Sequence, residues 1–123
     1  MGVNPVVSPS GFETFRRWPR YRLDIPVRLV VNKSNKTAIV QGRGNELNEG
    51  GLTLFAGIEL VPDEQIFVEF TPPYAGGPIR AHCVVRNREH YRYGVEFILE
   101  NQEDQDNAER IRGVLRGYGV PIH

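Results

Sequence analysis

The chain has 123 residues, of which 40% are hydrophobic and 24% charged; this is the composition of one folded domain and excludes a wholly disordered protein. Its 15 basic and 15 acidic residues cancel, which removes the overall positive charge that drives non-specific binding to nucleic acids. Thirteen glycines and nine prolines interrupt the chain at short intervals and favour many short strands over a few long helices.

Residues 1–15 contain prolines, glycines and serines but no hydrophobic period, so we expect a flexible N-terminal arm there. This segment has neither the basic stretch nor the apolar stretch of a secretory signal. No apolar run in the chain has the length of a membrane span. We therefore expect a cytoplasmic protein that does not insert into a membrane.

From Arg22 onward, hydrophobic side chains recur at every second residue, which is the period of a half-buried strand. The pattern predicts six short strands over about residues 22–31, 37–47, 51–56, 66–70, 79–86 and 91–97. Pro26 indicates an edge or a bulge in the first of them, and residues 71–78, rich in proline and glycine, are expected to form a loop. Strands of this length separated by turns predict a small closed antiparallel barrel.

The core of this barrel is expected to consist of the hydrophobic residues that share one strand face. They are Leu23, Ile25, Val27, Leu29, Leu52, Leu54, Val68, Cys83, Val85, Val95 and Phe97.

The last part of the chain has a different period. Between Asn101 and Gly117, hydrophobic residues recur every three or four positions, as on one face of an amphipathic helix. We expect Ile111, Val114 and Leu115 to cover one side or end of the barrel. The predicted fold is therefore all-β with one helix: a six-stranded antiparallel barrel followed by a C-terminal amphipathic helix.

Two segments carry the residues that predict function. The first contains five arginines within thirteen residues, opposed there only by Asp24: Arg16, Arg17, Arg20, Arg22 and Arg28. A guanidinium group bonds a phosphate with two donors and stacks on flat rings, so these arginines are candidates for binding a nucleotide, although a solvated basic stretch has the same pattern. The second segment, Glu46-Leu47-Asn48-Glu49-Gly50-Gly51-Leu52, predicts a tight turn whose glycines allow a ligand to approach the backbone.

Together the two segments resemble the PilZ domain, a small bacterial barrel that binds cyclic di-GMP. The first motif of that family is an arginine, three residues and a second arginine just before the first strand, and Arg16 and Arg20 match it. The second motif is Asp or Asn, any residue, Ser, two residues and Gly, and it falls on Glu46, Asn48 and Gly51. Glu46 thus replaces Asp or Asn, and Asn48 replaces Ser.

The resemblance spans about residues 16–118, which we take as a single PilZ-like barrel domain, with residues 119–123 as a tail. It implies a signal-transduction receptor that binds cyclic di-GMP and, on binding, changes its N-terminal arm and the surface seen by an effector protein. The ligand-binding residues that it implies are Arg16, Arg17, Arg20, Arg22, Glu46, Asn48 and Gly51. Because the second motif departs from the family pattern, a PilZ-like protein-interaction adaptor that no longer binds nucleotide stays open as the alternative.

Other functional classes find less support in the sequence. No spacing of a nucleophile and a base indicates an enzyme, and we expect neither catalysis nor a cofactor. His82 and Cys83 are adjacent and would point to opposite faces of a strand, so we expect no metal site. A module for single-stranded nucleic acid is disfavoured because the net charge is zero and the basic residues cluster in one short segment.

Overall fold

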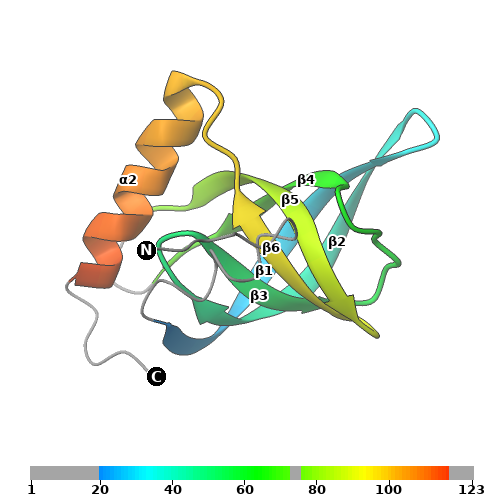
Figure 1. Ribbon diagram of the computed structural model, residues 1–123, viewed down its shortest axis with the longest axis horizontal. Helices are drawn as coiled ribbons and strands as arrows, with labels where there is room; N and C mark the ends of the chain where they lie inside the picture. The colour runs from blue at the N-terminus through cyan, green and yellow to red at the C-terminus, as the bar shows by residue number, and fades with distance from the viewer. Residues whose placement is uncertain (1–19, 73–75, 117–123) are drawn as a thin grey trace, which may run out of the picture.

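The structure is a computed structural model that describes residues 20–72 and 76–116. Figure 1 shows six strands and a C-terminal helix in the predicted order. Their bounds are β1 Tyr21–Lys33, β2 Lys36–Leu47, β3 Gly51–Ala56, β4 Gln65–Phe70, β5 Ile79–Glu89, β6 Arg92–Phe97 and α2 Gln102–Arg116. The predicted arm over residues 1–15 and the tail over residues 119–123 lie outside the described residues.

The six strands form a closed barrel in the order β1-β2-β3-β6-β5-β4, with β4 pairing back to β1 and every pair antiparallel. This confirms the predicted architecture. A register shift in the pairing of β1 with β2 lies between Arg22 and Ile25, directly before Pro26, where the proline indicated an edge or a bulge. Closure gives each strand a hydrogen-bonded neighbour on both sides.

The predicted core residues fill the barrel, and all but one of them are buried. The exception is Ile25, which is half-buried and packs against the edge of the core. Strand β4 pairs only with Arg28, Leu29 and Val30 of β1, so no strand covers Ile25 on that side.

Helix α2 packs against the barrel through the face that the sequence predicts, and Figure 1 shows it beside one end of the strands. Ile111 and Leu115 are fully buried in the same hydrophobic cluster as the barrel interior, whereas Val114 is only half-buried. The side chain of Asn101 caps the helix, because its Oδ1 accepts a hydrogen bond of 2.8 Å from the backbone N–H of Asp104. No helix in the described part of the chain is long and apolar enough to cross a membrane.

Gly42 is a position at which the barrel tolerates no side chain. A β-carbon at Gly42 would clash with the carbonyl oxygen of Phe55, a backbone atom of the paired strand β3. We expect Gly42→Ala to lower the free energy of unfolding by about 1–3 kcal/mol in urea denaturation, because the strands must move apart. Gly113 in α2 has open space around it, so Gly113→Ala should instead raise the free energy of unfolding, by up to about 1 kcal/mol. Equal stability of Gly42→Ala and the wild type would contradict this account.

Candidate functional site

The structure brings residues of the two motif segments together where β1 begins. Arg22 of β1 pairs with Glu46 of β2, and the guanidinium Nη1 of Arg20 lies 3.7 Å from the carboxylate Oε1 of Glu46. Arg16 and Arg17 lie outside the described residues. One residue from each motif, Arg20 and Glu46, therefore meets the other at one point on the barrel.

Two irregularities in the strand pairing position Glu46. In addition to the shift in β1, the register between β2 and β3 shifts between Gly44 and Glu46, which leaves Asn45 as the extra residue of a bulge. Such bulges redirect the side chains beside them. The Oδ1 atom of Asn45 is buried and has no hydrogen-bond partner among the described residues. The bulge thus places a carboxylate and an unsatisfied amide oxygen next to each other in the chain.

The ion pair between Arg20 and Glu46 is weak enough to be exchanged for a ligand. The Arg20 side chain is 38% exposed and that of Glu46 is 15% exposed. Solvent screens a pair of this kind, and such pairs contribute only about 0–1 kcal/mol to stability. A ligand that offers Arg20 a phosphate or a guanine edge has little intramolecular energy to overcome.

Asn48 forms the turn between β2 and β3. Its Oδ1 accepts hydrogen bonds from the backbone N–H groups of Gly50 and Gly51, at 2.7 and 2.8 Å, and its own N–H donates to the carbonyl of Gly51 at 3.0 Å. The side chain is buried. A serine hydroxyl accepts the same kind of local bond, more weakly. Asn48 in place of the serine of the motif therefore preserves the turn. Glu46 in place of Asp or Asn instead lengthens the side chain that lies beside Arg20.

The turn between β2 and β3 also contacts helix α2, a contact that the sequence does not predict. Arg112 Nε of α2 lies 3.5 Å from the carboxylate of Glu49, and both side chains are largely shielded from solvent. No local pattern indicates this contact, since the two residues are far apart in the sequence. It ties the second motif to the helix that covers the barrel.

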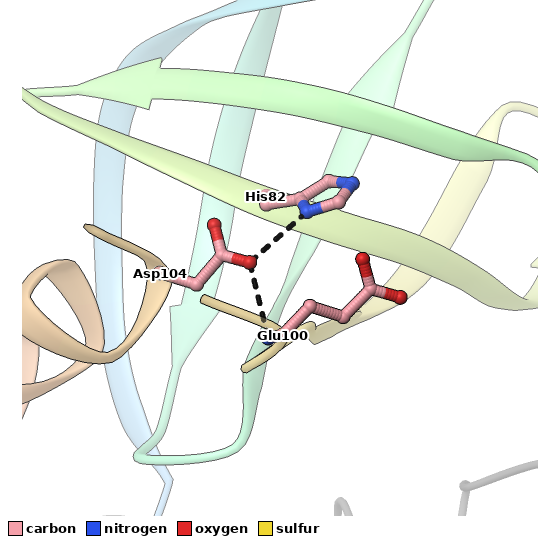
Figure 2. A group of neighbouring side chains, drawn as sticks. All are labelled: His82, Glu100 and Asp104. Atoms are coloured by element: carbon pink, nitrogen blue, oxygen red, sulfur yellow. Dashed lines mark hydrogen bonds and ion pairs between the residues drawn. The ribbon is translucent and has the colours of Figure 1, made fainter. Parts of the chain in front are cut away.

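A second group of polar side chains lies where α2 meets β5. Figure 2 shows His82 of β5, Glu100 of the preceding loop and Asp104 of the first helical turn. The sequence predicts His82 on the outer face of its strand but does not predict that Glu100 and Asp104 lie beside it. The pair Asn101 and Asp104 does have the spacing of a capping box, a signal from which the start of the helix could have been predicted.

Comparison with known proteins identifies the architecture. The family model of the PilZ domain matches residues 14–116. Among solved structures, the chain is similar to the PilZ domain of CeSA from a cellulose-synthesizing bacterium, with 17% identity and a TM-score of 0.62 over 79% of this chain and 97% of that one. It is also similar to MrkH, described as a c-di-GMP-dependent transcription regulatory factor, with 18% identity and a TM-score of 0.58 over 85% of this chain and 52% of that one. A search of the curated proteins found no significant match.

The turn at Asn48 can be tested by stability measurements. Asn48→Ala removes the acceptor of two backbone N–H groups, and we expect it to lower the free energy of unfolding by about 1–2 kcal/mol. Asn48→Ser should lower it less, because the hydroxyl still accepts. As a control, Gln41→Ala at an exposed position should change it by no more than about 0.5 kcal/mol. Identical urea midpoints for Asn48→Ala and the wild type would exclude a structural role for this side chain.

Proposed function

Because the chain belongs to the PilZ domain family, whose members are cyclic di-GMP receptor and adaptor domains, we propose that it is a receptor that binds cyclic di-GMP and passes the signal to an effector protein. The observation that carries the proposal is the contact of Arg20 with Glu46, because it joins the two motif segments at one place. The proposed location is the cytoplasm, and the proposed activity is binding without catalysis.

The ligand chemistry supports the arginines as the main anchors. Cyclic di-GMP offers two phosphates and two guanine rings, and a guanidinium group can bond the O6 and N7 atoms of guanine or a phosphate while it stacks on a ring. Each charge-assisted hydrogen bond contributes about 1.5–3 kcal/mol, whereas micromolar affinity needs about 8 kcal/mol. We therefore propose that Arg16 and Arg20 act together, with Arg17 and Arg22 adding positive charge.

We propose Glu46 as the polar group opposite the arginines, held in place by the turn that Asn48 and Gly51 form. Glu46 can accept hydrogen bonds from the donor edge of guanine, although its side chain is one methylene longer than the aspartate of the family motif. In the ligand-free structure its carboxylate lies near Arg20, so the ligand must share or replace this contact. The departures of Glu46 and Asn48 from the family motif favour the second candidate function, a protein-interaction adaptor that has lost nucleotide binding.

Calorimetric titration with cyclic di-GMP distinguishes the two functions. We expect the wild type to bind, and Arg20→Ala to weaken binding at least about tenfold, because a charge-assisted bond of about 1.5 kcal/mol or more is lost. Arg20→Lys should also weaken binding, since an ammonium group can neither form a bidentate hydrogen bond nor stack on a guanine ring. The double variant Glu46→Asp/Asn48→Ser restores the family motif and should bind more tightly than the wild type.

The matched control is Arg28→Ala. Arg28 lies on the same strand as the site but is bound to Glu69, at 2.8 Å, so its removal should leave the affinity unchanged. If neither the wild type nor the double variant binds at high micromolar cyclic di-GMP, the receptor function is excluded and the adaptor function remains.

We further propose that the ligand acts as a switch by drawing residues 16–20, directly before β1, onto the barrel, which changes the surface available to the effector. Hydrogen–deuterium exchange should then be rapid for amides of residues 1–15 without nucleotide, and cyclic di-GMP should slow it over residues 16–20, which precede the paired residues Tyr21 and Arg22 of β1. Amides of α2 that do not contact the ligand serve as the internal reference. Equal protection with and without the ligand would remove the switch while leaving binding itself possible.

A further inference from the structure

His82, Glu100 and Asp104 form a cluster on the barrel surface that shares no residue with the proposed nucleotide site. One potential ligand atom from each side chain lies within 4.8 Å of the others. Figure 2 shows the imidazole of β5 facing the first turn of α2, with the Glu100 side chain reaching toward the same space. Strand β5 and the chain segment that begins helix α2 thus present one nitrogen and two carboxylates to a common point.

Two of the three side chains are held firmly by the fold. His82 is 14% exposed and stacks on Phe67, with ring centroids 4.8 Å apart and planes at 17°. Asp104 is 7% exposed, and its Oδ2 accepts the backbone N–H of Glu100 at 3.1 Å. Glu100 itself is exposed and free to adjust its side chain. His82 and Asp104 are thus held in fixed positions, whereas the Glu100 side chain can adjust.

The two polar contacts of the His82 ring bear on whether its Nδ1 atom can bind a metal ion. Its Nε2 is 3.1 Å from Oε1 of Gln65, and its Nδ1 is 3.3 Å from Oδ2 of Asp104. The Asp104 carboxylate only accepts, the Gln65 amide has both an acceptor and a donor, and a neutral imidazole carries only one N–H. If Nε2 donates to Gln65, the lone pair of Nδ1 faces a carboxylate oxygen, an arrangement that a cation between them stabilises. Histidines that ligate metals usually donate their other ring N–H to a protein oxygen in this way.

We propose that His82 Nδ1 and the carboxylates of Asp104 and Glu100 bind a divalent transition-metal ion of the zinc class. The 3.3 Å between Nδ1 and Oδ2 is close to the edge of about 3.3–3.4 Å in a tetrahedron with bonds of 2.0–2.1 Å, the usual zinc–nitrogen and zinc–oxygen lengths. An imidazole with two carboxylates suits zinc, manganese or iron(II) better than the all-oxygen sites typical of calcium and magnesium.

Cys83 does not belong to this site although it is adjacent to His82. Its side chain faces the barrel interior, and burial raises the pKa of its thiol far above the ordinary value, with the negative charge of Asp104 adding to the rise. Its sulfur therefore lies on the opposite face of the strand from the His82 ring. Three protein ligands leave a fourth position open. Glu100 and Gln65, the residue that His82 contacts, also line a surface groove of about 590 Å³.

Titration of the chelator-treated protein with zinc tests the site. We expect one zinc ion per chain by calorimetry and a higher melting temperature with zinc than without it. The cobalt(II) form should show the visible absorption of a low-symmetry nitrogen–oxygen site. Glu100→Gln removes one ligand from an exposed position while the backbone N–H of residue 100 remains, and it should weaken zinc binding at least about tenfold, as should His82→Ala.

Two matched controls separate this site from loose association of zinc with surface groups. Glu103→Gln alters an exposed acid in the same helical turn, and His90→Asn alters an exposed histidine whose positive φ of 57° asparagine also adopts. Both should bind zinc as the wild type does. If the wild type binds neither zinc nor cobalt, or if Glu100→Gln binds zinc as tightly as the wild type, the proposal is wrong. The cluster is then an ordinary hydrogen-bonded contact between the helix and the barrel.

Discussion

Closure of the six-stranded barrel is the constraint on which the other features depend. Closing the sheet pairs β4 with β1 and leaves no open edge along it, but the strands must tilt and stagger to meet. The register shifts beside Ile25 and Glu46 are part of this geometry. Arg20, directly before β1, and Glu46, near the end of β2, lie beside these irregularities.

Helix α2 connects the barrel interior with both polar sites. Its buried face contributes Ile111 and Leu115 to the core, and this apolar packing anchors the helix. Around that anchor, Arg112 reaches the turn of the second motif, whereas Asp104 reaches β5. A ligand at the turn and an ion at the helix N-terminus would therefore act on one rigid element, which gives the two proposed sites a physical connection.

The two departures from the family motif have different structural meanings. The Asn48 side chain accepts hydrogen bonds from backbone N–H groups of its own turn, and a serine can also accept such bonds. This departure therefore concerns the structure of the turn. Glu46 lies beside Arg20. Its side chain is one methylene longer than that of aspartate, which shifts the position of the carboxylate that a ligand would contact. Sequence comparison alone gives both positions equal weight, because a motif records residue types and not what each side chain contacts.

The sequence by itself determined the strands, the helix and most of the core, because periods of two and of three to four are local properties that the chain carries wherever it folds. The motif residues and the turn at Asn48 were likewise visible in it. Only the tertiary structure decided that Arg20 meets Glu46, that Glu49 meets Arg112, and that His82, Glu100 and Asp104 converge. These contacts join residues far apart along the chain. They depend on strand register, on bulges and on where the helix docks, and no local pattern of residues encodes those distances.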